Sequence, residues 1–325
     1  MERKFNYSAI TGSLNQVCDR FVPGGYKTVL SFEEIVKNLA SLNVLQGAEL
    51  CYSEEGIESD ASAVKEILDK YNLVPTFVNC PLFGHKKWAK GSLSAADHSV
   101  RKHAVETILK VMDFARDVGC DGVNLWLGQD GFDYVFQTDY KKQWENLIES
   151  VKTCADYNPD IKLTLEPKLR EPRNRSLIDT TSTALLMCVE IDRKNVGITI
   201  DLGHVLQAGQ NMAQNVEIAL KYDKLFNIHA NDNYGSWDDD MVVGSVHMTE
   251  YLELFYSLKR FGYDKWLSVD IFPYREDQFE AARECILYME KFREKVDVMG
   301  VDKLTDVILT GDACKALRLL REAAL

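Results

Sequence analysis

Four segments of the chain alternate apolar and polar residues and end in a side chain that can bind a metal ion. In LTLEPK, Leu163 and Leu165 share one face of an extended strand, and Glu166 lies on the opposite face. The segments ITID, FNIHAN and LSVDI repeat this pattern. The polar groups near the four ends are Glu166, Asp201, His229 and Asp270. If the segments are neighbouring parallel strands, these four side chains meet at one edge.

Three carboxylates and one imidazole in one buried place would repel one another and lose hydration unless a cation joined them. This donor set suits Mn, Mg, Co or Zn, and its oxygen-rich character favours Mn or Mg. In a barrel of parallel strands, sites form at the C-terminal ends of the strands, where these residues lie. The alternative is that each is an ordinary polar residue hydrogen-bonded to a loop. Four strands in the same phase favour the metal site.

A second group of metal-binding residues follows two of these strands. His204 lies three residues after Asp201, and Asp238, Asp239 and Asp240 form an acidic run after FNIHAN. An isolated run of aspartates is commonly a solvated loop. Together with His204, Asp238 and Asp240 are candidates to bind a second ion that Asp201 bridges to the first. A site with two ions would clamp two oxygens of a substrate. We expect one ion per chain, or two if this second group also binds metal.

Other side chains near these strand ends are candidates to contact a substrate. Lys168 shares the face of Glu166, where it can polarise a carbonyl oxygen beside a metal or form a salt bridge with the carboxylates. Trp126 ends the fourth strand, and Phe83 and Trp88 flank the loop after the third. These aromatic side chains either form apolar walls for a sugar ring or pack in the core.

Eight strand-like segments alternate with eight helical patterns along the chain. The strands are expected at 5–11, 47–51, 74–80, 122–126, 162–166, 197–201, 226–230 and 267–271. The helices are expected at 32–43, 59–72, 97–117, 139–157, 176–191, 211–222, 248–262 and 276–295. Ser31 and Thr138 are N-cap signals before two of them. This alternation predicts an α/β fold, a single closed (β/α)8 TIM barrel.

The chain is longer than these eight units require. We assign residues 1–296 to the barrel and residues 297–325 to a short C-terminal helical tail, which includes the amphipathic run ACKALRLLREAAL. Because the tail is surplus to a barrel, it either caps the bottom or reaches the neighbouring subunit of a homo-oligomer.

Charge and composition exclude several classes of protein. The 325 residues carry a net charge of −12, which argues against a nucleic-acid partner because phosphate binding relies on Lys and Arg. The eight cysteines include no CxxC pair, as expected for buried thiols in a reducing compartment. MERKFNYSAITG lacks the apolar region of a secretory signal, and no stretch reaches the ~18 apolar residues of a membrane helix. We therefore expect a cytoplasmic protein without a membrane partner.

The segment EPKLREPR, from Glu166 to Arg173, resembles the signature after the fifth strand of xylose isomerases. The resemblance covers about residues 45–295 and includes VPTFVNCPLFGHKKWAKGSLSAAD, NLWLGQDG, GITIDLGHVLQAGQN, LFNIHAND and LSVDIFPYRED in the expected order. It implies a structural metal held by Glu166, Asp201 and Asp270, and a catalytic metal held by Asp201, His204, Asp238 and Asp240. It also implies that Lys168 contacts the substrate carbonyl and that Trp126 and Phe83 line the substrate pocket. Arg173, at the end of the motif, is a further candidate substrate contact.

Some positions are more similar to another branch of the same superfamily. Asp201 stands where xylose isomerases have Glu, and His229 stands where they have Asp. His229, with IDLGH before it, resembles the sugar epimerases and hydroxypyruvate isomerases, which hold one metal with Glu, Asp, His and Glu. Asp270 is one methylene shorter than the last of these. Cys51 replaces the His that is thought to open a pyranose ring, which points to an open-chain or otherwise different sugar.

These observations make a metal-dependent sugar isomerase the main functional hypothesis. It would interconvert an aldose and a ketose by a hydride shift, with Lys168, Glu166, Asp270 and His204 as the catalytic candidates. The alternative is a ketose 3-epimerase in which the carboxylates Glu166 and Asp270 transfer the proton. A third hypothesis is a barrel that binds a sugar without turnover. A nuclease of the same superfamily would need more histidines to hold several Zn ions, and a basic face to bind nucleic acid. The chain has only six histidines and a net charge of −12, which disfavour this hypothesis.

Overall fold

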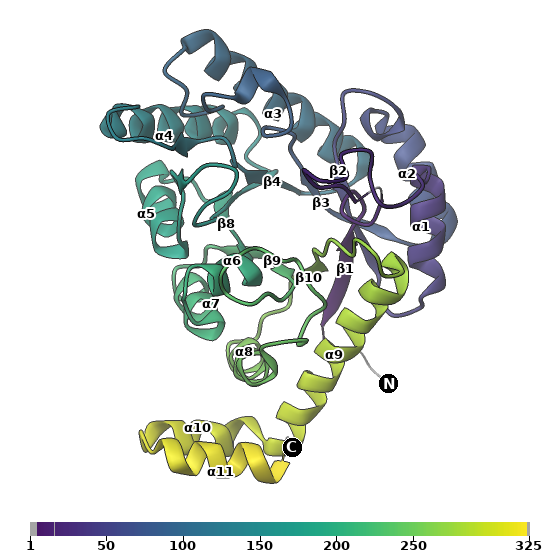
Figure 1. Cartoon of the computed structure of the whole chain (residues 1–325), viewed down its shortest axis with the longest axis vertical. Coiled ribbons are helices and arrows are strands. Elements are labelled where there is room, and N and C mark those ends of the chain that lie inside the picture. The colour runs from purple at the N-terminus through teal and green to yellow at the C-terminus, as the bar shows by residue number, and fades with distance from the viewer. Residues whose placement is uncertain (1–4, 16, 324–325) are drawn as a thin grey trace.

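Eight parallel strands form a closed barrel in the computed structural model, which describes residues 5–15 and 17–323 (Figure 1). Each strand pairs with its neighbours in the order β1, β10, β9, β8, β6, β4, β3, β2. Their bounds are β1 (Asn6–Ile10), β2 (Gly47–Cys51), β3 (Val74–Asn79), β4 (Gly122–Trp126), β6 (Lys162–Glu166), β8 (Val196–Asp201), β9 (Leu225–Ala230) and β10 (Trp266–Val269). The predicted (β/α)8 barrel is therefore confirmed.

Helices surround the barrel on its outside (Figure 1). They are α1 (Phe32–Ser41), α2 (Ala61–Tyr71), α3 (His98–Val118), α4 (Tyr140–Tyr157), α5 (Thr181–Ile191), α7 (Met212–Lys221), α8 (Met248–Arg260) and α9 (Gln278–Met299). The sequence did not predict α6 (Leu202–Gln207), which begins directly after β8. Two short 3₁₀ turns, η1 (Ile57–Ser59) and η2 (Lys86–Trp88), lie in the loops after β2 and β3. None of the described helices is long and apolar enough to cross a membrane.

Local polar side chains set where the helices begin. Ser31 accepts a hydrogen bond from the backbone N–H of Glu34, and the Glu34 carboxylate accepts one from the backbone N–H of Ser31. The predicted N-cap of α1 is thus confirmed as a capping box. The predicted N-cap Thr138 is wrong, because the next residue, Asp139, accepts the hydrogen bond from the backbone N–H of Lys142. Aspartate is a stronger N-cap residue than threonine.

The helix expected at 176–191 begins later because its first residues belong to a β-ribbon. β5 (Gly131–Phe132) and β7 (Arg175–Ser176) pair antiparallel and join the loops after β4 and β6. α5 starts only after Thr180, whose hydroxyl accepts a hydrogen bond from the backbone N–H of Thr183. The ribbon ties together two loops at the C-terminal end of the barrel.

The two faces of the strands differ as the sequence alternation predicts. Leu163 and Leu165 are completely buried in the apolar core. Thr164 and Thr199 lie on the opposite face, where the Thr199 hydroxyl donates to the Thr164 hydroxyl at 2.8 Å and Thr164 donates to Asn124 Oδ1 at 2.8 Å. Because these hydroxyl and amide groups satisfy one another, the barrel interior tolerates polar side chains below the strand ends.

Two further helices follow α9 at the C-terminal end of the chain. They are α10 (Val301–Leu309) and α11 (Ala313–Ala323), and Figure 1 shows them beside the lower end of α9, away from the barrel centre. Leu319 packs into the core, whereas Leu309 and Leu317 are exposed. The last two residues of the predicted tail lie outside the described part of the chain. The division between barrel and tail at residue 296 stays a prediction, because α9 runs across it.

Candidate metal centre

The four strand-end side chains identified in the sequence lie together at the C-terminal end of the barrel. Glu166 and Asp201 end β6 and β8, His229 lies near the end of β9, and Asp270 follows β10. Each offers one ligand atom, and these four atoms all lie within 4.8 Å of one another. The first three side chains are buried, and that of Asp270 is 18% exposed. We call these four residues the first cluster.

The imidazole of His229 is oriented so that one nitrogen faces the first cluster. Its Nε2–H donates to Glu49 Oε1 at 2.9 Å, so Nδ1 is the nitrogen that carries the lone pair whenever the ring is neutral, as a metal ligand must be. Among the described residues Nδ1 has no hydrogen-bond partner. It faces Asp270 Oδ2 at 3.5 Å and Glu166 Oε1 at 3.6 Å. A buried lone pair among carboxylate oxygens is unfavourable alone, so these residues fit a divalent cation.

Glu49 is a site residue that the sequence reasoning missed. It is completely buried on β2 and accepts hydrogen bonds from Asn79 and Asn227, each at 3.0 Å, besides that from His229. Burial acts to raise its pKa, but His229 and the hydrogen bonds with Ser268 and Asn227 outweigh burial and lower the pKa. The signal in the sequence is the alternation of GAELC, which puts Glu49 on the same face as Cys51.

Two asparagines hold the carboxylates of the first cluster. Asn124 Nδ2 donates to Glu166 Oε2 at 2.6 Å, and Asn231 Nδ2 donates to Asp201 Oδ2 at 2.9 Å. One oxygen of Glu166 is therefore fixed by the barrel, and the other, Oε1, faces His229. Such supporting hydrogen bonds orient ligands before a metal arrives.

The charges of the first cluster shift its pKa values in opposite directions. Burial raises the pKa of Asp270 to about 7, and Asp201 and Glu166 add to the increase while His229 opposes it. Burial also acts to raise the pKa of Glu166, but His229 outweighs burial and lowers this pKa to about 2. Burial acts to lower the pKa of His229, which Glu49 and Glu166 nevertheless raise well above its usual value. Metal ligands must be deprotonated, so metal binding releases protons from this cluster.

Asp201, His204 and Asp238 form a second cluster, whose ligand atoms also lie within 4.8 Å of one another. Asp201 caps α6 by accepting a hydrogen bond from the backbone N–H of His204 at 2.9 Å, which places the His204 ring. Nδ1–H of this ring donates to Pro167 O at 3.0 Å, and Nε2 lies 3.0 Å from Asp238 Oδ2. Burial acts to lower the pKa of His204, but Asp201 and Asp238 raise it to about 9.

The close approach of α6 to the loop after β9 depends on a glycine. A Cβ atom at Gly203 would overlap Asn231 Oδ1, so any larger residue would have to displace this amide. The backbone oxygen of Gly203 accepts a hydrogen bond from Asn233 Nδ2 at 2.8 Å. The DLGH segment therefore positions His204 through both a cap and a residue without a side chain.

Lys168 belongs to the second cluster rather than to an open pocket. Its Nζ lies 2.8 Å from Asp238 Oδ2 and 2.6 Å from Glu171 Oε2, and it sits 5.0 Å from the centre of the Trp126 ring. Burial acts to lower the pKa of Lys168, but Asp238 and Glu171 raise it, so the ammonium stays charged. Asp238 Oδ1 has no hydrogen-bond partner among the described residues.

The loop that carries Asp238 is closed at its base. Asp232 and Met241 exchange two backbone hydrogen bonds, of 2.8 and 3.0 Å, and the Asp232 carboxylate lies 2.7 Å from Nδ1 of His247. This clamp holds the acidic run over the end of the barrel.

The remaining aspartates of the run are placed differently from Asp238. Asp239 accepts a hydrogen bond from the backbone N–H of Tyr234 at 3.1 Å. Asp240, which the resemblance implies to be a metal ligand, belongs to neither group of ligand atoms in the described chain. Burial raises its pKa well above the usual value, and the charges of Asp238 and Asp270 raise it further.

The predicted substrate-contact residues are not all at the clusters. The rings of Phe83 and Trp126 lie 4.6 Å apart, and the latter borders Lys168. Trp88 is completely buried, and its indole N–H donates to Pro81 O at 3.2 Å, so it packs in the core. Arg173 forms an ion pair with Asp133 at 2.7 Å, which adds a second link between the loops joined by the β5–β7 ribbon.

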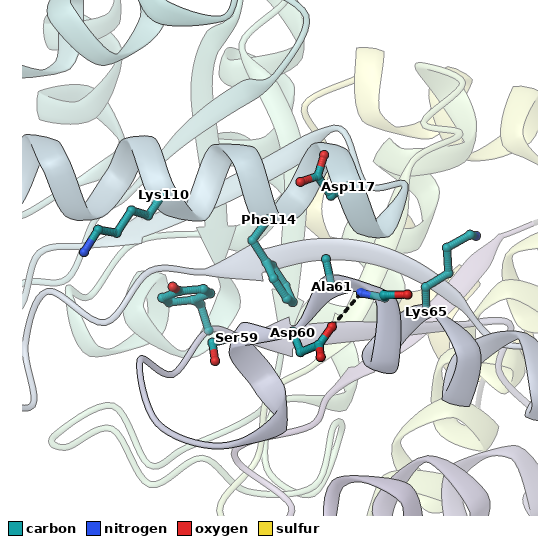
Figure 2. Close-up of a pocket in the computed structure, with 9 residues that line it drawn as sticks. Ser59, Asp60, Ala61, Lys65, Lys110, Phe114 and Asp117 are labelled. Atoms are coloured by element: carbon teal, nitrogen blue, oxygen red, sulfur yellow. Dashed lines mark hydrogen bonds between the residues drawn. The ribbon is translucent and has the colours of Figure 1, made fainter.

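A surface cavity of about 580 Å³ lies outside the barrel, along α2 and α3 (Figure 2). Figure 2 shows Lys65 and Lys110 at opposite ends of this cavity and the ring of Phe114 between them. Asp60 at its edge caps α2 by accepting hydrogen bonds from two backbone N–H groups. No residue of the two clusters lines this cavity.

Fold and site together define a (β/α)8 barrel with a candidate metal centre at the C-terminal ends of its strands. The chain belongs to the xylose isomerase-like TIM barrel family, whose model matches residues 32–292. The resemblance inferred from EPKLREPR and the motifs around it is thereby confirmed for the family.

Several solved structures are similar to this chain. An L-ribulose 3-epimerase is 16% identical, with a TM-score of 0.71, and the match covers 91% of this chain and 98% of that one. A D-tagatose 3-epimerase-like protein is 22% identical, with a TM-score of 0.69, and the match covers 90% and 100%. The D-allulose 3-epimerase of a Methylomonas species, in complex with D-allulose, is 15% identical, with a TM-score of 0.67 and coverages of 89% and 98%. At these identities the likeness shows the fold.

Proposed function

We propose that this protein is a metal-dependent sugar epimerase, which inverts a carbon beside the carbonyl group of a ketose. The observation that carries the proposal is the placement of Glu166 and Asp270. Both lie within 3.6 Å of His229 Nδ1, yet they come from β6 and from the end of β10, which β8 and β9 separate in the barrel. The two carboxyl groups thus approach one point from different strands, as removal of a proton from one face and its return to the other require.

The first cluster is the proposed binding site of the metal. Glu166, Asp201, His229 and Asp270 would hold the ion, which we predict to be Mn or Mg, with Co also suitable. Such an ion supplies a Lewis acid that draws electron density from a carbonyl oxygen and so acidifies the neighbouring C–H group.

The proton transfers belong to the two carboxyl groups. One takes the proton from the carbon beside the carbonyl, and the other, in its protonated form, returns a proton to the opposite face of the same carbon. Asn124 fixes one oxygen of Glu166, so the other oxygen keeps its direction toward the cluster. The similar structures support a ketose as the substrate, since they include 3-epimerases of ribulose and allulose.

A panel of ketoses and aldoses in deuterated water, with Mn, Mg or Co added, tests this function. We expect a ketose to be converted to its epimer with deuterium at the inverted carbon, and Glu166→Gln and Asp270→Asn each to lower kcat/KM by about 10²–10⁴-fold. Asp130→Asn, which changes a buried carboxylate that Ser92 and Ser94 hold, is the matched control and should retain activity. Product formed without deuterium at the reacting carbon would exclude proton transfer.

The second candidate function is aldose–ketose isomerisation by a hydride shift. It is favoured by Lys168, which lies against the second cluster and can donate to a substrate oxygen there. In the same panel, an aldose formed from a ketose with no deuterium taken from the solvent would select this function. The cytoplasmic location and the homo-oligomer stay predictions.

A further inference from the structure

We propose that the ammonium of Lys168 takes the cation position of the second cluster in the sugar-free protein. The chain then binds one divalent ion tightly and admits a second only when Lys168 leaves Asp238. This inference rests on the proposed function only in that the first cluster holds the tight ion.

The second cluster already contains the positive charge that its carboxylates need. Asp238 Oδ2 lies 2.8 Å from Lys168 Nζ and 3.0 Å from His204 Nε2, so this one oxygen contacts both nitrogen atoms. Lys168 is held from a second side by Glu171 at 2.6 Å, and only 8% of its side chain is exposed. The carboxylates of the first cluster, by contrast, form ion pairs with His204 and His229 but with no lysine or arginine of the described chain.

A divalent ion and this ammonium cannot share Asp238 at low cost. An ion bound through the second cluster would lie beside a positive charge that contacts the same carboxylate. In a buried site, where screening by water is weak, two cations this close repel strongly. A charged lysine therefore weakens the second metal position without blocking the first, because the ion pairs of Lys168 within the described chain are with Glu171 and Asp238.

A bound sugar has the chemistry to release this competition. An ammonium carries three N–H donors, and a carbonyl or hydroxyl oxygen placed beside the first cluster would accept from Lys168. Lys168 lies 2.8 Å from Asp238, which contacts the His204 ring at 3.0 Å, and the same ring lies 3.4 Å from Glu166 Oε1, so a sugar bound at the first cluster would lie near Lys168. The second ion would then enter together with the sugar.

Counting bound Mn²⁺ tests the competition directly. Protein freed of metal with a chelator is titrated with Mn²⁺ in the absence of sugar, and free Mn²⁺ is measured by electron paramagnetic resonance. The wild type should bind one ion tightly. Lys168→Met and Lys168→Gln, which remove the charge, should bind two, and their second ion should bind at least tenfold more tightly than that of the wild type.

Two matched variants assign the effect to charge and to Asp238. Lys168→Arg keeps the charge and should bind one tight ion. Asp238→Asn added to Lys168→Met should remove the second ion again, and Asp238→Asn alone should leave the single tight ion of the wild type in place. Two tight ions in the wild type, or one ion in both charge-free variants, would overturn the proposal. Because no sugar is present, the counts stand even if no substrate turns over, so failure of the proposed function is seen separately.

Discussion

The two clusters share Asp201 and lie at the same end of the barrel, but they are completed in different ways. In the first, strand residues turn carboxylate oxygens and an imidazole nitrogen toward one point, and within the described chain the carboxylates pair with His204 and His229 but with no lysine or arginine. In the second, the same types of ligand surround Asp238, which Lys168 already neutralises. Metal-binding residue types are therefore not enough to define an ion site, because the chain's own cations compete for it.

The clusters also differ in the elements that carry them. The first is built on β6, β8, β9 and β10, whose relative positions the barrel fixes. The second depends on the short helix α6 and on the loop after β9 that Asp232 closes. We expect the first to be rigid and the second to adjust to what is bound, because sites on strands are held more precisely than sites on loops.

Among residues that are not themselves proposed ligands, Glu49 is expected to have the largest effect on metal binding at the first cluster. Glu49→Gln removes the charge that orients and polarises His229, so the affinity for Mn²⁺ should fall by about 10–100-fold. Competition with a chelator measures this affinity. Asp130→Asn, the matched buried carboxylate, should leave it unchanged. Equal losses in both variants would mean that Glu49 acts on overall stability and not on the ligand.

The two clusters should also differ in the pH at which they bind Mn²⁺. The raised pKa of Asp270, about 7, means that a proton must leave before Mn²⁺ binds. Affinity at the first cluster should therefore rise by about tenfold per pH unit, or more, below pH 7. At the second cluster, His204 keeps its proton up to pH about 9, so any ion there needs higher pH. An affinity that is flat between about pH 6 and 7 would contradict this order.

The stability of the metal-free protein should depend on pH with the opposite sign. A carboxyl group whose pKa is higher in the folded than in the unfolded protein binds its proton more tightly in the folded protein. It therefore stabilises the fold at a pH low enough to protonate it in both the folded and the unfolded protein. The contribution of Asp270 is thus fully present below its usual pKa of 3.8 and is lost as the pH rises through about 7. Thermal unfolding with and without Mn²⁺ should show the ion protecting most above pH 7.

The smallest effect is expected far from either cluster. Ser31→Ala removes the capping box of α1 and should lower the free energy of unfolding by about 1 kcal/mol. Mn²⁺ counts and affinities should not change, which denaturant titration and metal titration together would establish. Ser41→Ala, at the other end of α1, is the control and should cost less, because Ser41 only donates back to Asn38 O within the helix.

The sequence was most informative where strand alternation and family motifs agreed. A period of two placed Glu166, Asp201 and Asp270 on inward faces, and a barrel then brings inward strand ends together. It did not reveal that Glu49 reaches His229, because β2 and β9 are not neighbours and the contact crosses the barrel interior. Nor did it settle whether Lys168 would meet Asp238, since that depends on how a loop folds back over the barrel.

Other features escaped prediction because they arise from pairing between distant loops. The β5–β7 ribbon consists of two-residue strands, which have no period to detect. α6 is too short for a hydrophobic pattern, and only its cap, Asp201, is visible in the sequence. For Trp88 the sequence left open a substrate wall or core packing, and its burial against Pro81 and His103 places it in the core.

The ribbon between the loops after β4 and β6 also has a consequence for building hybrids of this protein with its relatives. β5 and β7 pair across it, and Asp133 bonds to both Arg173 and Asn174. If only the loop after β4 were replaced by that of a relative, its strand would have to pair with a β7 from a different protein. The two loops form one exchangeable module, so a chimaera that transfers both together should keep the rim of the barrel intact where a single graft would not.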